Sequence, residues 1–166
     1  MNKDLSNNNI RSVLFVCHGN ICRSPMAEFI FKDMVRKAGL EDVRIDSAAV
    51  SYEEEGNDIY PPAKRTLHGH GIPFGRHSAH RVTDAEASEY DVIIVMDASN
   101  RRLLSRIISP MNMSKVHLMM KYAGKDSDVS DPWYTGYFEK TYRDITEGCA
   151  GLLESLSQAE PISTVG

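Results

Sequence analysis

The sequence lacks an excess of positive charge and any long apolar run. It contains 19 Lys and Arg residues against 23 Asp and Glu residues, which gives a net charge of -4. This balance argues against a broad nucleic-acid-binding surface, although a local cationic pocket is compatible with it. No segment approaches the roughly 20 apolar residues that a membrane-spanning helix needs. We therefore expect neither nucleic acid nor a membrane as a partner.

Cysteine is scarce as well. The chain has three cysteines, an odd number, which argues against the disulfide framework of a small secreted protein. Residues 1–9 contain one basic residue and no apolar core, so they resemble neither a signal peptide nor a transit peptide. We expect residues 1–10 to be a disordered tail and the protein to work in the reducing cytoplasm.

Nucleotide-binding motifs, internal repeats and linkers are also missing. Neither the Walker A pattern nor G-x-G-x-x-G occurs, so nucleotide-dependent chemistry has no support. The length of 166 residues fits one domain with a sizeable core. We predict a single folded domain over residues 11–160.

Strands and helices alternate along this domain. Continuous apolar runs have the pattern of strands buried on both faces, as in a parallel sheet. They cover residues 12–17, 43–50, 91–97 and 115–120. Helices are predicted at residues 24–39, 61–71, 83–86 and 99–109, and from about residue 135 onward. This alternation predicts an α/β fold, an open parallel sheet with helices on both faces.

Local signals mark where two of the helices begin. Ser24 has the character of an N-cap, with Pro25 at the first helical position, and Gly39 ends that helix. Thr83 and Glu86 have the spacing of a capping box. The first predicted helix therefore starts very soon after the first predicted strand.

The stretch between them, VLFVCHGNICRSPMAE at residues 13–28, contains a C-x5-R pattern from Cys17 to Arg23. Cys17 lies at the carboxyl end of the first strand, the edge at which open parallel sheets bind ligands. Gly19 allows the backbone to turn its amides inward, and the following helix N-terminus adds partial positive charge. Arg23 offers a planar fork for two phosphoryl oxygens. These surroundings favour a thiolate, so we predict a loop that binds a phosphate and attacks it.

The alternative interpretation of Cys17 is packing, because a free cysteine often behaves as a small buried hydrophobe. A bare C-x5-R pattern also occurs by chance. The longer pattern C-x5-R-S-P is more specific here, because it closes an apolar strand and opens a helix within the first few dozen residues.

This pattern resembles the signature loop of the low-molecular-weight protein tyrosine phosphatases. Four further segments match in family order: IDSAA, HGI, MDASN and DPWYTG. The resemblance covers nearly the whole chain from residue 13 to the last helix. It implies a three-layer open sandwich with a four-stranded parallel sheet and the phosphate loop after the first strand. It also implies a cysteinyl-phosphate intermediate and no metal or other cofactor.

The resemblance assigns roles to individual residues. Cys17 would be the nucleophile, Arg23 the phosphate clamp and Asp131 the general acid. The loop residues expected at the substrate are His18, Gly19, Asn20, Ile21, Cys22 and Ser24. Within that set, His18 would contribute its backbone, Asn20 would hold the loop's shape, and Ser24 would donate a hydrogen bond to the thiolate. His77 would buttress the loop from behind.

The sequence itself also supports Asp131 as a general acid, without the resemblance. A carboxylic acid on the loop after the fourth strand can protonate a leaving oxygen and later activate water. An Asp-Pro pair otherwise indicates a turn or a helix N-cap. The adjacent Trp133 and Tyr134 favour the functional interpretation, because an aromatic wall suits a phosphotyrosine ring. Tyr52, after the second strand, is either the opposite wall or an ordinary surface tyrosine.

Histidines and the last cysteine are weaker candidates. Four histidines stand at residues 68, 70, 77 and 80, but they lack the usual carboxylate or thiolate co-ligands of a metal site. The HGHG segment instead fits a helix C-terminus, where cationic side chains are favoured. His80 stands where the family often has another basic residue. Cys149 lies on the apolar stripe of the last helix, so we expect it to pack in the core.

Cys22 shares the loop with Cys17. A loop wound around a phosphate brings its two ends together, so the geometry permits a disulfide between these cysteines. The family resemblance points the same way. We predict that mild peroxide forms this disulfide reversibly, since a nearby thiol can capture a sulfenic acid. The alternative is that Cys22 is only a small packing residue.

Several functions are compatible with such a loop. The first is a phosphotyrosine phosphatase that acts on protein substrates, as a monomer or weak dimer. An arsenate reductase of the same fold needs further redox cysteines in the stretch that follows the HGI segment, and residues 73–90 of this sequence contain none. A non-enzymatic anion-binding module would have lost Cys17 or Asp131. Relatives that act on phosphoarginine carry threonine where this chain has Ile21, so we expect phosphotyrosine to be favoured.

Overall fold

The computed structural model describes residues 10–40 and 42–165, of which residues 157–165 are described by their backbone alone. Residues 1–9 of the predicted tail lie outside the described residues. Ile10, which the prediction assigned to that tail, is buried and packs in the core. The folded part of the chain therefore includes Ile10.

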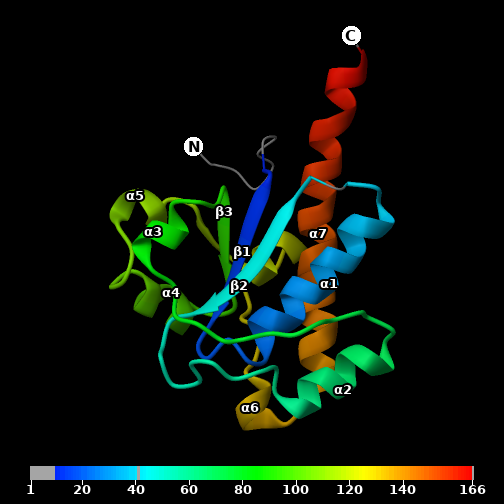
Figure 1. The fold of residues 1–166 in the computed structure, drawn as a ribbon. Helices are drawn as coiled ribbons and strands as arrows, with labels where there is room; N and C mark the ends of the chain where they lie inside the picture. The colour runs from blue at the N-terminus through cyan, green and yellow to red at the C-terminus, as the bar shows by residue number, and fades with distance from the viewer. Residues whose placement is uncertain (1–9, 41, 166) are drawn as a thin grey trace.

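Four parallel strands form a sheet in the order β2-β1-β3-β4 (Figure 1). They are β1 (Ser12–Cys17), β2 (Arg44–Ala49), β3 (Val92–Val95) and β4 (Val116–Leu118). β1 pairs with β2 along its whole length, so that Cys17 lies opposite Ala49. Because the strands are parallel, their carboxyl ends meet at one edge of the sheet. The predicted four-stranded parallel sheet is confirmed.

Helices cover both faces of this sheet. The larger ones are α1 (Arg23–Lys37), α2 (Pro61–Gly69), α4 (Ala98–Leu104) and α7 (Phe138–Val165). The short ones are α3 (Asp84–Ala87), α5 (Pro110–Met113), α6 (Pro132–Thr135) and the 3-10 helix η1 (Met119–Ala123). In Figure 1, α1 and α7 lie on one face, whereas α3, α4 and α5 lie on the other. This is the predicted three-layer α/β open sandwich.

Alternate residues of β1 belong to two separate cores. Val13, Phe15 and Cys17 pack with residues of α1, α2 and α7. Leu14 and Val16 point to the opposite face and pack with residues of α3 and α4. A strand that serves both cores has no solvated face, which explains why its sequence is continuously apolar.

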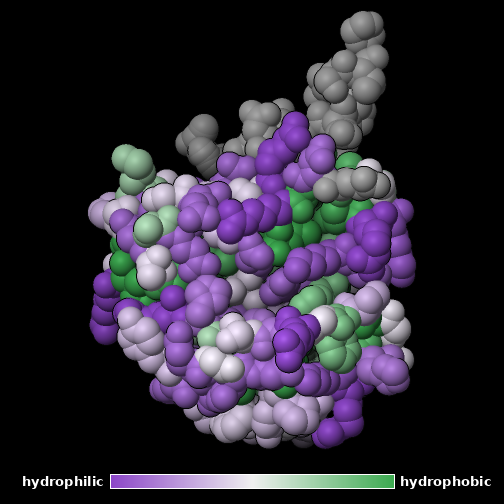
Figure 2. Space-filling model, viewed as in Figure 1, coloured by the Kyte–Doolittle hydropathy of each residue, from purple (hydrophilic) through white to green (hydrophobic). Residues whose placement is uncertain are grey.

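The outside of the molecule is mainly polar. On the face shown in Figure 2, hydrophilic residues cover most of the surface and apolar residues show in separate patches. Among the described residues, no helix is both long enough and apolar enough to cross a lipid bilayer.

Two predicted elements end earlier than the sequence pattern indicated. The helix predicted over residues 99–109 is α4, which ends at Leu104. Ser109 is extended and caps α5, because the following Pro110 disfavours a helical conformation in the residue before it. The fourth strand ends at Leu118, and η1 follows it directly.

The last helix begins later than predicted, at Phe138 instead of about residue 135. Pro132–Thr135 form the separate short helix α6. Gly136 ends α6 with a φ of 77°, a left-handed conformation that glycine adopts without steric cost. The chain therefore turns between α6 and α7, which a helical periodicity alone does not reveal.

Candidate active site

Cys17 is the last residue of β1 and is 3% exposed. Two backbone amides of the loop point at its sulfur, with Asn20 N at 3.3 Å and Ser24 N at 3.4 Å from Sγ. The turn that brings them there occurs at Asn20, whose φ is 63°, and not at Gly19 as predicted. Asparagine tolerates this left-handed conformation better than most residues.

Gly19 has a different role from the predicted turn. A Cβ at this position would lie 3.2 Å from Cγ of Glu54, so the missing side chain makes room for the segment after β2. A larger residue at position 19 would therefore crowd the Glu54 side chain, which would have to shift slightly.

Ser24 is not the N-cap of α1, contrary to the prediction. The helix begins at Arg23, and the capping position, Cys22, makes no side-chain capping hydrogen bond. Ser24 Oγ instead turns inward and lies 3.1 Å from Cys17 Sγ. The Ser24 side chain thus contacts the cysteine and does not cap the helix.

A chain of buried hydrogen bonds sets the direction of that contact. Asn20 Nδ2 donates to Ser24 Oγ at 2.8 Å and to Ser47 Oγ at 3.0 Å. Ser47 in turn donates to Glu28 Oε1 at 2.6 Å. The hydroxyl hydrogen of Ser24 is left for Cys17 Sγ, the nearer of its two possible acceptors, or for the carbonyl of Ala48 at 3.4 Å. The network thus presents a donor to a thiolate.

Two histidine positions hold Asn20 from behind. His77 Nε2 donates to the carbonyl oxygen of Asn20 at 2.7 Å. The backbone N–H of His80 donates to Asn20 Oδ1 at 3.2 Å, which fixes the orientation of the side-chain amide. His80 Nε2 is bound to Glu86 at 2.8 Å, so the imidazole does not face the loop. Because Glu86 is engaged there, only Thr83 contributes its half of the predicted capping box.

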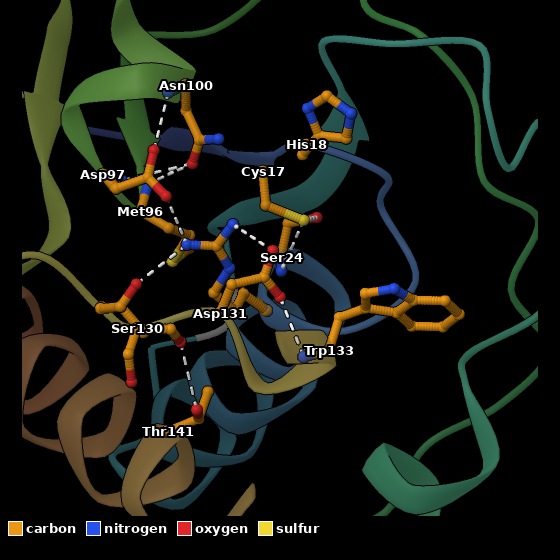
Figure 3. A network of polar contacts seen from close by, with 12 residues as sticks. Cys17, His18, Ser24, Met96, Asp97, Asn100, Ser130, Asp131, Trp133 and Thr141 are labelled. Atoms are coloured by element: carbon orange, nitrogen blue, oxygen red, sulfur yellow. Dashed lines mark hydrogen bonds and ion pairs between the residues drawn. The ribbon is translucent and has the colours of Figure 1, made fainter. Parts of the chain in front are cut away.

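Arg23 is 2% exposed, and its guanidinium is held by three groups. Nη1 donates to Asp97 Oδ2 at 2.7 Å and to the carbonyl of Val129 at 2.9 Å. Nη2 lies 3.4 Å from Asp131 Oδ2 (Figure 3). Burial alone would lower the pKa of Arg23, but the negative charges of Cys17 and the two aspartates raise it above its ordinary value. The arginine is therefore a fixed positive charge beside the cysteine.

Asp97 was not predicted as a site residue. It lies two residues after the end of β3, and β3 pairs with β1, so Asp97 and Cys17 emerge at the same edge of the sheet. One of its oxygens orients Arg23, and the other accepts from Asn100 N at 2.8 Å and caps α4. The sequence contained the signal, because an aspartate immediately after a central parallel strand lies where such sheets place their ligands.

Asp131 comes from the segment after β4. Its Oδ1 accepts from Trp133 N at 3.1 Å and so caps α6, while Oδ2 faces Arg23. Asp131 therefore fulfils both interpretations of the Asp-Pro pair, because it is the N-cap of α6 and also a residue of the site. The structure brings Asp131, Arg23 and Cys17 together.

These residues line one cavity of about 120 Å³. Its lining consists of Cys17, His18, Gly19, Ile21, Cys22, Arg23, Glu53, Glu54, Asp131, Trp133 and Tyr134. Trp133 and Tyr134 stand at the mouth, 51% and 83% exposed, while the cysteine is buried at the base. Asn20 and Ser24 contact the cysteine or its loop from behind and do not line the cavity.

Tyr52 is not the opposite wall. The guanidinium of Arg81 lies 4.6 Å over its ring, and Arg81 Nη1 donates to the tyrosine hydroxyl at 2.9 Å. Glu53 and Glu54, the next two residues, line the cavity instead. The surface interpretation of Tyr52 fits this position, because the adjacent cation holds the ring away from the cavity.

Comparison with known proteins identifies the family. The model of the low molecular weight phosphotyrosine protein phosphatases matches residues 12–161. The chain belongs to this family. The low molecular weight protein-tyrosine-phosphatase YfkJ of Bacillus subtilis is 40% identical over 155 residues, which are 91% of this chain and 99% of that protein. The human low molecular weight phosphotyrosine protein phosphatase is 37% identical over 150 residues, 87% of this chain and 94% of that protein.

Solved structures agree with this assignment. The crystal structure of YfkJ superposes with a TM-score of 0.85 at 39% identity and covers 93% of this chain and 99% of that one. The crystal structure of DARP, a Drosophila arginine phosphatase, gives a TM-score of 0.79 at 33% identity, with 86% of this chain and 95% of that one covered. The fold is therefore that of low molecular weight phosphatases.

The two other cysteines of this phosphatase differ in position. Cys22 lines the cavity and is 5% exposed. Burial raises the pKa of its thiol, and the negative charges of Cys17 and Asp131 raise it further. Cys149 is fully buried in the core beside α1 and β1, which confirms the packing prediction, and burial raises the pKa of its thiol too. All three cysteines are free.

The remaining histidines do not converge on one point. His70 binds Glu139 at 2.7 Å and stacks on Tyr142, with 3.8 Å between the ring centroids. His77 and His80 face Asn20 and Glu86, as described above. Within residues 10–40 and 42–165, no group of three or more His, Cys, Asp or Glu side chains is arranged to hold a metal ion.

Proposed function

We propose that this low molecular weight phosphatase hydrolyses phosphotyrosine in proteins, and small aryl phosphates, through a cysteinyl-phosphate intermediate. The observation that carries the proposal is the position of Cys17. Its sulfur lies at the base of a cavity within reach of two backbone amides and Ser24, with Arg23 and Asp131 in the same lining.

The first step is transfer of the phosphoryl group to sulfur. The Cys17 thiolate attacks phosphorus, so an S–P bond forms while the P–O bond to the tyrosine ring breaks. Arg23 and the loop amides neutralise the charge on the phosphoryl oxygens. The 3.4 Å contact between Arg23 and Asp131 is the longest of the three on the guanidinium and can give way to a phosphoryl oxygen. Protonated Asp131 gives its proton to the leaving phenolate oxygen.

The second step is hydrolysis of the cysteinyl phosphate. Asp131, now a carboxylate, takes a proton from a water molecule that attacks phosphorus. The S–P bond breaks, inorganic phosphate forms and the thiolate returns. Ser24 and the two amides that face the sulfur stabilise it as a leaving group.

The depth of the cavity favours phosphotyrosine over phosphoserine. The nucleophile is 3% exposed at the base, and two exposed aromatic rings stand at the mouth. A phenyl ring is long enough to carry a phosphate from the mouth to the sulfur, whereas the short serine side chain is not. Trp133 and Tyr134 provide the apolar contact that the ring needs.

Phosphoarginine is the second candidate substrate, because a structural neighbour of similar fold is an arginine phosphatase. Ile21 contributes to the cavity lining, while most of its side chain is buried in a small cluster with Cys22 and Ala79. We propose that the bulk of Ile21 favours phosphotyrosine. Comparable kcat/KM values on phosphoarginine and phosphotyrosine peptides would refute this part of the proposal, and Ile21→Thr is the matched variant that should shift the ratio towards phosphoarginine.

One assay tests the reaction itself. We expect the protein to hydrolyse para-nitrophenyl phosphate and a phosphotyrosine peptide in the presence of excess chelator, because no step uses a metal. Loss of turnover on adding the chelator would overturn the cysteine mechanism. An arsenate reductase of this fold would need further redox cysteines, and the one cysteine besides Cys17 and Cys22, Cys149, is buried elsewhere in the core.

We also propose that the enzyme works in the cytoplasm, as a monomer or weak dimer, on phosphotyrosine proteins. Support comes from the three free cysteines, which suit a reducing compartment. Sedimentation velocity over a range of protein concentrations tests the oligomeric state, and a concentration-independent stable oligomer would contradict it.

A further inference from the structure

The two sides of the cavity mouth differ in chemistry. One side carries Trp133 and Tyr134. The other side, which we name the polar wall, consists of His18, Glu53 and Glu54. Any peptide that inserts a phosphotyrosine between them must place its neighbouring residues against these two surfaces.

The polar wall is held firmly against the phosphate loop. Ser51 Oγ donates to the carbonyl of His18 at 2.9 Å, and His18 Nε2 lies 3.2 Å from Glu53 Oε2. Asn57 Nδ2 donates to Glu54 Oε1 at 2.8 Å, while the stem of that glutamate packs over the bare backbone of Gly19. These contacts place the two carboxylates at the cavity, with Glu53 exposed and Glu54 half-buried.

Negative charge on this wall is not balanced by nearby lysine or arginine. Among the ion pairs of the described residues, His18–Glu53 is the only one that involves either glutamate. The imidazole can donate this hydrogen bond without cancelling the charge of the carboxylate. Arg81, from the segment between α2 and α3, is engaged with the ring and hydroxyl of Tyr52. Deeper in the cavity, Arg23 already faces Asp97 and Asp131.

We infer that Glu53 and Glu54 are specificity-determining residues that make this enzyme prefer phosphotyrosine segments with Lys or Arg beside the phosphotyrosine. The inference rests on the proposed function and names the class of substrate. A long basic side chain next to the phosphotyrosine reaches the polar wall, whereas Asp or Glu there is repelled by it. Both carboxylates are partly exposed, so each contributes a modest, salt-dependent effect.

The experiment uses three phosphotyrosine peptides that differ only in the residues on either side of the phosphotyrosine, which are Lys, Ala or Glu. The kcat/KM of each is measured at about 0.01 M and about 1 M salt, where the screening length is roughly 30 Å and roughly 3 Å. We expect the Lys peptide to exceed the Glu peptide by roughly 5- to 20-fold at low salt, with the Ala peptide between them. At high salt the ratio should approach one.

Two variants separate this effect from a structural one. The double variant Glu53→Gln/Glu54→Gln should bring the Lys-to-Glu ratio at low salt within about 2-fold of one. Glu55→Gln is the matched control, because Glu55 is exposed and does not line the cavity, and it should leave the ratio and the rate on para-nitrophenyl phosphate unchanged. Equal rates on the three peptides, or a ratio that survives in the double variant, would overturn the inference and leave the proposed function intact. Failure to hydrolyse any of the peptides would overturn both.

Discussion

The phosphate loop, residues 17–24, and the acid loop, residues 125–137, supply the two reacting groups but are held very differently. In the phosphate loop, Cys17, Asn20, Arg23 and Ser24 are all at most 3% exposed, and their polar atoms are bound by buried or half-buried partners. In the acid loop, Asp131 has one backbone donor and a 3.4 Å contact to Arg23. Its neighbouring aromatic rings stand in solvent.

This difference separates two requirements of the reaction. The phosphoryl group is the same in every substrate, so its site can be built in advance from fixed donors. The leaving group and the residues that flank it differ between substrates. The residue that protonates the leaving group therefore benefits from a loop that can change its conformation. Gly124 and Gly136, both with positive φ, mark the two ends of the acid loop and are natural points for such adjustment.

The largest effect should come from removing the nucleophile. Cys17→Ser should abolish turnover, because a serine alkoxide is far harder to form than a thiolate. Phosphate should still bind, since the loop amides and Arg23 remain. Turnover of para-nitrophenyl phosphate and calorimetric titration with phosphate measure the two properties. Residual turnover close to that of the unmodified enzyme would exclude Cys17 as the nucleophile.

Removing the acid should give a loss that depends on the leaving group. Asp131→Ala should lower kcat roughly 10²–10⁴-fold on aryl phosphates with poor leaving groups and much less on activated ones. A series of substituted phenyl phosphates measures this dependence. If the rate falls equally across the series, Asp131 is not the proton donor and the contrast between the two loops is wrong.

Replacing Arg23, the phosphate clamp, should lower kcat by a similar factor for good and poor leaving groups. Arg23→Lys keeps the charge but cannot reproduce the planar fork, whose Nη1 binds Asp97 and the carbonyl of Val129 while Nη2 faces Asp131. We expect a loss of roughly 10²–10³-fold in kcat, the scale of a lost donor to a developing anion. The same series of substituted phenyl phosphates measures this loss. If kcat falls only for poor leaving groups, Arg23 acts in the protonation of the leaving group together with Asp131, and not as the phosphate clamp.

The smallest effect on catalysis should follow from Cys22→Ser. This variant compares the two cysteines of the phosphate loop, of which only Cys17 reacts with the substrate. We expect mild peroxide to convert Cys17 to a sulfenic acid, from which the Cys22 thiol displaces water to form a disulfide. We expect wild-type inactivation to be reversed by a thiol reductant and slowed by bound phosphate. In Cys22→Ser, turnover should be largely kept but inactivation should become irreversible.

Peptide mapping of the oxidised, non-reduced protein decides this point. A disulfide-linked pair of peptides that contain Cys17 and Cys22 is the expected product. Recovery of Cys17 as a sulfinic or sulfonic acid, together with a free thiol at Cys22, would contradict it. Cys149, buried in the core, should remain a free thiol throughout and serves as the internal control.

Sequence reasoning succeeded where one local pattern carried the information. The apolar run of β1 and the C-x5-R-S-P pattern after it predicted the central strand, the loop and the helix. It failed where a tertiary contact decided the outcome: Ser24 turns to Cys17 instead of capping α1, and Arg81 holds Tyr52 away from the cavity. Asp97 was missed although its place at the carboxyl end of a central parallel strand was a usable signal; only its contact with Arg23 depends on β3 lying beside β1.

The position of Cys17 at the end of β1 has a consequence for how the enzyme loses activity under stress. β1 is flanked on both sides by other strands, and its side chains join the two cores of the molecule. The backbone of Cys17 cannot shift without unpairing the strand whose side chains join the two cores. Heat that leaves the sheet intact should therefore impair the acid loop before it displaces Cys17, and loss of the nucleophile's position should coincide with the cooperative loss of tertiary structure.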